Sequence, residues 1–276
     1  MMKNIMADKR IMKEFLKCGY IDKKHLFPTE EGSPQGGLIS PTYANLVLDG
    51  LEPLLLNRYS TSSTGHYHPN YNKHKVHLCR YADDFIITAD DRETLVEIKE
   101  MVEKFMSDRG LMLSAEKTVI TNINDGFDFL GWNFRKFKGK LIIQPSVKSR
   151  KKITMKLSET VRKYRQADQD LLISKLNEIT RGWAEYHHCV CAKETFELID
   201  HRLWNMLWKW AKRRHSRKPH KWIKNRYWKS KGNRQWIFRT DKSILYSMSD
   251  MPIVRITSLN RHINPYLNQT TLKSEK

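Results

Sequence analysis

Two adjacent aspartates stand at the tip of a predicted β-hairpin. Residues 76–81 alternate in polarity, Ala82, Asp83 and Asp84 interrupt the alternation, and residues 85–88 resume as a strand. Nucleotidyl transfer needs two divalent cations about 4 Å apart. Mg²⁺ prefers carboxylate oxygens, so this pair suits such a site, although an ordinary Asp-Asp turn is an equal alternative. Neighbouring strand side chains point to opposite faces, so we expect Asp83 to be the principal ligand.

Three further segments precede or follow the hairpin. Upstream is a turn-dense run, Gly32-Ser33-Pro34-Gln35-Gly36-Gly37, followed by Ser40-Pro41 and Asn45. Its paired glycines permit a close approach of the backbone to a base pair, and Gln35 can both donate and accept hydrogen bonds. Downstream are Leu111-Met112-Leu113-Ser114-Ala115-Glu116-Lys117-Thr118 and Gly126-Phe127-Asp128-Phe129-Leu130-Gly131-Trp132.

Together with Arg80-Tyr81-Ala82-Asp83-Asp84-Phe85, these segments resemble the palm of reverse transcriptases, in order and at fitting distances. The resemblance implies a magnesium site at Asp83 and Asp84. It also implies that Lys117 lies near the triphosphate as a proton donor to pyrophosphate, with a surface lysine as the alternative. Nucleotide or template binding is implied for Gln35, Gly36, Gly37, Tyr81 and Ala82. The aromatic residues of 126–132 are expected in the core.

Positive charge is concentrated in the middle of the chain, which has a formal net charge of +20. Residues 1–145 carry 20 basic and 19 acidic residues, residues 146–240 carry 25 and 8, and residues 241–276 carry 5 and 3. A near-neutral part joined to a strongly basic part favours catalysis combined with polyanion binding. A solvated basic surface is the alternative. Membrane binding is disfavoured because the basic stretch lacks an apolar face and contains Pro219.

The sequence of the basic stretch narrows the choice among reverse transcriptase families. Residues 176–187, 204–210 and 215–219 resemble the maturase-specific thumb of group II intron-encoded proteins. This implies group II intron RNA, an RNA template and a DNA primer as partners, and roles in intron splicing and mobility. Retron-type and diversity-generating reverse transcriptases are the second choices. The expected RNA contacts are Arg181, Lys212, Arg213, Arg214, Arg217, Lys218 and Lys221. Trp204 and Trp208 share a helix face and are expected mainly in the core.

These patterns predict an α+β fold in three parts. Residues 1–145 would form a partial right-hand palm of antiparallel sheet and helices, and residues 146–235 an all-α basic thumb. Residues 236–276 would be a mostly irregular basic tail, interpreted as a remnant of a DNA-binding region. Helices are expected at 3–18, 38–48, 91–108, 151–166, 169–188 and 193–214, and strands at 111–120 and 127–143 with a turn at 138–139.

Part of the polymerase is expected to be missing. Related enzymes place another aspartate on a palm strand before the glycine-rich block, after a long fingers region. Only 31 residues precede Gly32, and Asp8 and Asp22 lie in no such strand. We therefore expect an incomplete two-metal site and an N-terminally truncated form with impaired polymerase activity. It would be a truncated remnant, a downstream reading frame after a frameshift, or half of a split enzyme whose other half is a separate N-terminal reverse transcriptase fragment. The alternatives are a non-catalytic RNA-binding splicing cofactor and a decayed fragment.

Cysteine usage and hydropathy place the protein in the cytoplasm. The four cysteines show no disulfide-framework spacing, the chain starts in charged sequence, and no apolar run approaches the roughly 18 residues that span a bilayer. The run from His187 to Cys191 does not favour zinc, because residues two apart on a helix point away from each other. No cysteine follows Cys191, so the zinc-bearing endonuclease module of many relatives is expected to be absent.

Overall fold

The computed structural model describes residues 8–22, 25–27, 40–62, 64–232 and 234–254. They belong to two compact units, residues 1–120 and 121–276. The division falls before the predicted boundary at residue 145, because the strands after residue 126 pack with the helices that follow them. Helices and antiparallel strands occur together, as expected for an α+β fold, and the three functional parts stay a prediction.

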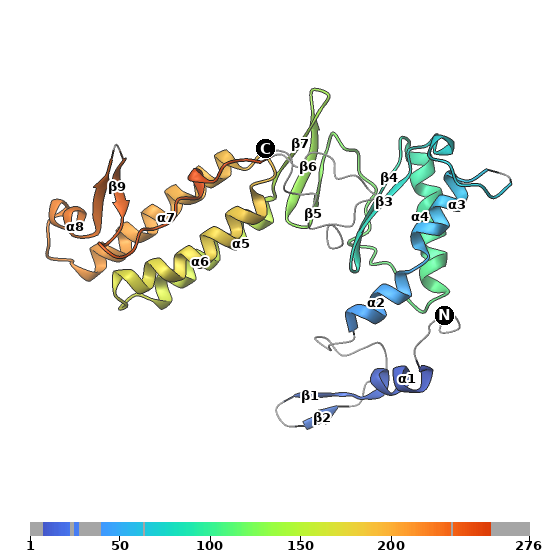
Figure 1. The fold of residues 1–276 in the computed structure, drawn as a ribbon, viewed down its shortest axis with the longest axis horizontal. Helices are drawn as coiled ribbons and strands as arrows, with labels where there is room; N and C mark the ends of the chain where they lie inside the picture. The colour runs from blue at the N-terminus through green and yellow to red at the C-terminus, as the bar shows by residue number, and fades with distance from the viewer. Residues whose placement is uncertain (1–7, 23–24, 28–39, 63, 233, 255–276) are drawn as a thin grey trace, which may run out of the picture. The chain divides into compact units, whose positions relative to one another are not determined.

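The first unit combines short helices with antiparallel strand pairs (Figure 1). Strand β1 pairs with β2, and β3 pairs with β4. The aspartates Asp8 and Asp91 cap α1 and α4 by accepting hydrogen bonds from backbone N–H groups of the first turn. In chain order the elements are α1 (Lys9–Lys17), β1 (Tyr20–Asp22), β2 (His25–Phe27), α2 (Ser40–Leu48), α3 (Leu51–Tyr59), the 3-10 turn η2 (Pro69–Tyr71), β3 (His77–Tyr81), β4 (Asp84–Thr88) and α4 (Arg92–Ser107).

Helix α4 supplies the core against which the β3–β4 hairpin packs. Ile98, Val102 and Phe105 recur at helical spacing and are buried, together with Leu51 and Leu55 of α3. Apolar residues of the hairpin cover this cluster: Leu78, Phe85 and Ile87. The predicted hairpin and the predicted helix at 91–108 are therefore confirmed, and their packing holds the aspartate-bearing tip in place.

The strand predicted at residues 111–120 is wrong. The segment is irregular and contains a turn in which the N–H groups of Lys117 and Thr118 donate to the Ser114 carbonyl. Its apolar residues suggested a buried strand, yet Met112 is 95% exposed and Val119 is 71% exposed. No strand among the described residues pairs with this segment, and the local turn satisfies two of its backbone N–H groups.

The second unit joins a three-stranded antiparallel sheet to a helical bundle (Figure 1). The sheet order is β5-β6-β7, and β8 pairs with β9 in a separate hairpin. The strand region predicted at 127–143 and the three long helices are confirmed, including a helix that continues through Gly182. In chain order the elements are β5 (Phe127–Phe129), β6 (Trp132–Phe137), β7 (Lys140–Pro145), α5 (Val147–Lys163), α6 (Gln169–His187), α7 (Lys193–Arg214), α8 (His220–Tyr227), β8 (Trp228–Lys231), β9 (Arg234–Phe238) and the 3-10 turn η3 (Met248–Asp250).

The prediction that residues 146–235 are all helical is wrong at its end, where the β8–β9 hairpin begins. Trp228 and Phe238 pair across this hairpin and are buried. Both pack on α7, since the Trp228 ring lies 5.2 Å from that of Trp208 and the Phe238 ring lies 6.0 Å from that of Trp210. Aromatic residues favour pleated, half-buried positions, so α7 provides the surface on which this hairpin forms.

The bundle core lies between α5, α6 and α7. Each helix contributes a stripe of fully or almost fully buried side chains, which interdigitate in a single cluster. They include Ile153 and Leu157 of α5, Leu172 and Leu176 of α6, and Phe196, Leu203 and Leu207 of α7. No helix among the described residues is long and apolar enough to cross a membrane.

A hydrogen-bonded histidine joins the sheet to the bundle. The indole Nε1 of Trp132 on β6 donates to Nδ1 of His187 at 2.9 Å. Nδ1 must therefore be unprotonated, so Nε2 carries the hydrogen and donates to Ser149 Oγ on α5 at 3.2 Å. That oxygen also accepts from Trp183 Nε1 at 3.2 Å. Both nitrogens of the His187 ring are thus engaged only while the ring is neutral.

We expect His187 to make stability depend on pH. Burial lowers the pKa of His187 to about 4, whereas a histidine in the unfolded chain titrates near 6.5. Between these values the unfolded chain binds a proton that the folded chain excludes, so stability present above pH 6.5 is lost as the pH falls towards 4. Urea unfolding should show a loss of at most about 2 kcal/mol between pH 7 and pH 5 from this residue.

The comparison for this measurement is the His187→Gln variant. It removes the titrating group, so the wild-type chain should lose more stability than the variant over the same pH interval. Identical pH dependence in the two proteins would show that His187 is not the group responsible.

Candidate metal-binding hairpin and nucleic-acid groove

The β3–β4 hairpin ends in a two-residue turn that presents both aspartates to solvent. Tyr81 pairs with Asp84 across the hairpin, so Ala82 and Asp83 form the turn. Ala82 has φ +54°, an uncommon conformation for a residue other than glycine, and its carbonyl accepts from Arg80 Nη1 at 3.0 Å. The same Nη1 donates to Asn45 Oδ1 on α2 at 2.9 Å. Arg80 therefore ties the turn to the helix that follows the glycine-rich segment.

Asp83 and Asp84 share a surface hollow with Lys117. The hollow has a volume of about 460 Å³, and its lining includes these three residues together with Ser114 and Thr118. Both aspartates are exposed, and neither is in an ion pair or a side-chain hydrogen bond with another described residue. Mg²⁺ commonly binds one or two carboxylates, with waters and substrate phosphates completing its shell. The free carboxylates fit that role, and the three residues predicted to be catalytic line the same hollow.

The other predicted nucleotide-binding residues divide into two groups. Tyr81 is 66% exposed beside the hollow, and Ala82 forms the turn. The glycine-rich residues Gln35, Gly36 and Gly37 lie outside the described part of the chain.

A second group of potential metal ligands lies at the start of α4. His74 Nδ1 is 3.2 Å from Asp91 Oδ2 and 3.7 Å from Asp90 Oδ1, the only such three-ligand cluster among the described residues. Asp91 is already engaged, because it accepts from Thr94 N at 2.6 Å and from Thr94 Oγ1 at 2.8 Å. These hydrogen bonds hold the pKa of Asp91 well below its usual range. The cluster is thus explained by helix capping.

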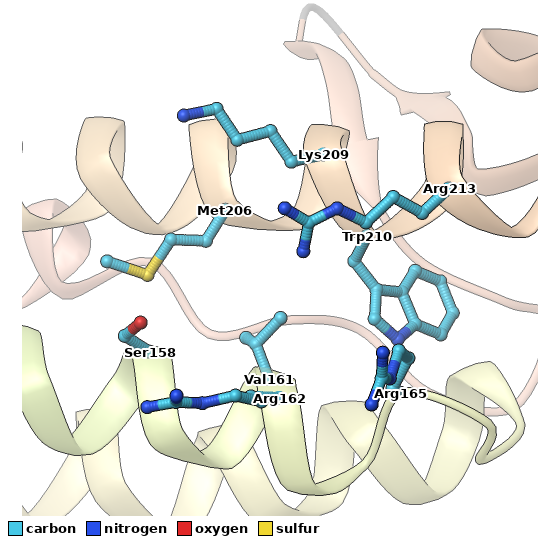
Figure 2. Close-up of a pocket in the computed structure, with 8 residues that line it drawn as sticks. All are labelled: Ser158, Val161, Arg162, Arg165, Met206, Lys209, Trp210 and Arg213. Atoms are coloured by element: carbon cyan, nitrogen blue, oxygen red, sulfur yellow. The ribbon is translucent and has the colours of Figure 1, made fainter.

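A basic groove of about 600 Å³ lies between α5 and α7 (Figure 2). Its floor is apolar, with Val161 and Trp210 buried beside the half-buried Met206. Four cationic side chains surround this floor, and Figure 2 shows that they come from both sides of the groove. They are Arg162 and Arg165 from the end of α5 and its following turn, and Lys209 and Arg213 from α7.

None of the four groove cations is in an ion pair with another residue that the structure describes. Four like charges around one groove repel one another, and a polyanion would relieve that repulsion. Of the four, only Arg213 was among the predicted RNA contacts. Helical spacing could have found Lys209 beside it, but the pairing of α5 with α7 that brings in Arg162 and Arg165 is a tertiary feature.

The remaining predicted RNA contacts have different surroundings. Arg181 lies over the Tyr246 ring at 4.8 Å, and Lys218 lies over the Trp222 ring at 5.5 Å. Arg214 instead donates from Nη1 to the carbonyls of Arg165 at 3.0 Å and Ala167 at 2.7 Å, so it ties the α5–α6 turn to the end of α7. The others are exposed: Lys212, Arg217 and Lys221.

The positive charge at the end of α7 also acts on a neighbouring histidine. The pKa of His215 is lowered first by burial and then by the charges of Arg214, Arg226 and Lys218. Its ring also holds a hydrogen bond of 2.7 Å between Nε2 and the Tyr227 hydroxyl. The local surface therefore disfavours additional positive charge.

Comparison with known proteins relates both units to one class of protein. Residues 2–134 match the model of the reverse transcriptase (RNA-dependent DNA polymerase) family, and residues 150–228 match that of the group II intron, maturase-specific domain. Protein YkfC of Escherichia coli (strain K12) is 33% identical over 135 residues, covering 42% of this chain and 35% of YkfC. Group II intron-encoded protein LtrA of Lactococcus lactis subsp. cremoris is 28% identical over 179 residues, covering 47% of this chain and 30% of LtrA. The chain thus spans about a third of the length of these relatives.

We expect two neighbouring arginines on α7 to differ in their effect on stability. Arg214→Ala removes the hydrogen bonds to two backbone carbonyls and should lower the free energy of unfolding by about 1 kcal/mol. Arg213→Ala removes an unpaired groove cation and should change it by less than about 0.5 kcal/mol. Urea unfolding of the two variants measures the difference, and equal effects would refute the structural role of Arg214.

Proposed function

Because the chain belongs to the family of group II intron-encoded reverse transcriptases and maturases, we propose that its basic thumb binds group II intron RNA and assists splicing. The observation that carries this proposal is the groove between α5 and α7. There Arg162, Arg165, Lys209 and Arg213 line one groove without an acidic partner among the described residues. Such an arrangement is suited to a phosphodiester backbone, which supplies repeated negative charge.

The shape of the groove supports backbone contact more than base reading. Its cations stand on both walls, so a strand lying along the groove could be contacted from two sides. Guanidinium groups form two parallel hydrogen bonds to phosphate, and lysine adds a point charge. Phosphate contacts position a nucleic acid without specifying its sequence, so recognition of one particular intron would depend on RNA shape or on contacts elsewhere.

We expect the double variant Arg162→Ala/Lys209→Ala to bind a group II intron transcript at least about tenfold more weakly than the wild-type chain at moderate salt. Each lost phosphate contact should also reduce the slope of log affinity against log salt by about one. Filter binding or fluorescence anisotropy over a series of KCl concentrations measures both quantities.

The matched control is Lys152→Ala/Lys156→Ala. It removes two exposed cations from α5 that are not part of the groove lining. The control should bind nearly as well as the wild-type chain. An equal loss in both double variants would show that net charge alone, and not the groove, determines binding.

We further propose that the β3–β4 hairpin belongs to an RNA-directed DNA polymerase site. The supporting observation is that Asp83, Asp84 and Lys117 line one hollow. Divalent cations, when bound, activate the primer 3′ oxygen and neutralise the charge of the leaving pyrophosphate. Asp83 and Asp84 would hold them, and the Lys117 ammonium group could donate a proton to the pyrophosphate.

We expect primer extension on an RNA template with Mg²⁺ to require Asp83. The assay uses the chain alone and the chain mixed with a fingers-containing fragment of a related reverse transcriptase. Asp83→Ala should lower the measured extension by at least about a hundredfold, because a metal ligand is lost. It should leave intron RNA binding unchanged, because the hairpin is not part of the basic groove.

Asp108→Ala is the charge-matched control, since it removes an exposed carboxylate at the end of α4 in the same unit. Extension that survives Asp83→Ala would exclude the proposed metal site. No extension in either assay would leave RNA binding as the remaining function of the chain.

A further inference from the structure

Four tryptophans form an aromatic cluster on the α7 surface covered by the β8–β9 hairpin. The rings of Trp204 and Trp208 are stacked, with centroids 5.6 Å apart and an interplanar angle of 6°. Trp236 of β9 lies 6.0 Å from the first ring and 6.1 Å from the second. Trp228 of β8 packs against both at 5.9 and 5.2 Å. We call Trp204, Trp208, Trp228 and Trp236 the tryptophan cluster.

Packing in a hydrophobic core explains the tryptophan cluster only in part. Trp228 is buried, but Trp204 and Trp208 are half-buried and Trp236 is 39% exposed. Trp236 also has φ +60°, which is a strained conformation for a bulky residue. In addition, the buried Trp228 indole Nε1 has no hydrogen-bond partner among the described residues. Strain and an exposed indole at the same position suggest a role beyond packing.

The charge around the tryptophan cluster indicates which ligand it would attract. Residues 201–240 contain fourteen lysines and arginines and no aspartate or glutamate. The Lys224 ammonium group lies 4.2 Å from the centroid of the Trp236 ring, and His220 meets the Trp208 ring edge-on at 5.7 Å. An anionic ligand with flat aromatic groups matches this surface in charge and in shape.

We propose that the tryptophan cluster is a stacking site for unpaired bases of single-stranded RNA. A base would stack on the exposed Trp236 indole, and the Lys224 ammonium group would move from the ring to the adjacent phosphate. Lysine has a flexible stem and three donors, so this exchange needs no backbone movement. The inference rests on the proposed RNA binding for its ligand class, but it concerns a different surface.

The tryptophan cluster and the basic groove lie on different sides of α7. The cluster uses Trp204 and Trp208, whereas the groove uses Met206, Trp210 and Arg213. Residues two apart on an α-helix are separated by about 200° around its axis. One RNA could therefore contact both surfaces only by passing around α7.

The test compares a labelled oligouridine with a blunt RNA duplex, using fluorescence anisotropy with the full chain. Trp236→Ala should weaken oligouridine binding at least about fivefold, which is the lower range for the loss of one stacked base. Duplex binding should change by less than about twofold, because a blunt duplex offers a free base face only at its ends. Trp236→Phe, which keeps an aromatic ring, should recover most of the affinity for oligouridine.

Trp222→Ala is the matched control. Trp222 is 38% exposed in the same basic region, but it contacts His215 and Lys218 and is outside the tryptophan cluster. This variant should bind oligouridine as the wild-type chain does. A second measurement, quenching of the intrinsic tryptophan fluorescence by oligouridine, uses the unaltered chain. If a base stacks on Trp236, oligouridine should quench the tryptophan fluorescence strongly in the wild-type chain and less strongly in the Trp236→Phe variant.

The possible failures are distinguishable. If Trp236→Ala binds oligouridine normally, or if oligouridine does not quench the wild-type chain, the stacking site is refuted while groove-dependent duplex binding stands. Equal losses for oligouridine and duplex in Trp236→Ala would likewise refute it, as a general disturbance of the fold. If the wild-type chain binds neither RNA, both the stacking site and the proposed RNA binding are wrong.

Discussion

A neutral imidazole holds the sheet of the second unit against its helices. His187 accepts from Trp132 on β6 through Nδ1 and donates to Ser149 on α5 through Nε2. Both contacts are possible at once only in one tautomer, because protonation of Nδ1 would set two donors against each other. Tyr186 reinforces the junction, since its ring stacks on Trp132 and its hydroxyl donates to the Leu130 carbonyl at 2.6 Å. The junction therefore sets where α5 starts relative to α6, and hence where α5 faces α7.

The position of α5 relative to helix α7 matters because three sides of α7 carry different surfaces. One side is buried in the bundle core through residues such as Leu203 and Leu207. A second side forms the basic groove with α5, and a third carries the stacked tryptophans beneath the β8–β9 hairpin. Cations on this helix are consequently not equivalent. Arg213 stands unpaired in the groove, whereas its neighbour Arg214 fastens the α5–α6 turn.

Motif boundaries and packing boundaries differ in this chain. The segment Gly126-Phe127-Asp128-Phe129-Leu130-Gly131-Trp132 resembles a palm block in sequence, yet it packs with the maturase-like helices, because Trp132 bonds to α6. The opposite occurred at residues 111–120, where a strand was predicted but no strand among the described residues pairs with the segment. Periodicity reports which side chains could be buried, and it does not report what they are buried against.

Local patterns alone determined the long helices, the β3–β4 hairpin with its aspartates and the family, since capping, periodicity and motif order are properties of short segments. They also singled out Arg213, in the middle of the basic region, as an expected RNA contact. Only the tertiary structure placed Lys117 and Asp83 around the same hollow, and only it added Arg162 and Arg165 to the groove and left Trp236 exposed. Each of these depends on contacts between elements distant in sequence. Such contacts are decided by how buried faces pack together, which no local pattern encodes.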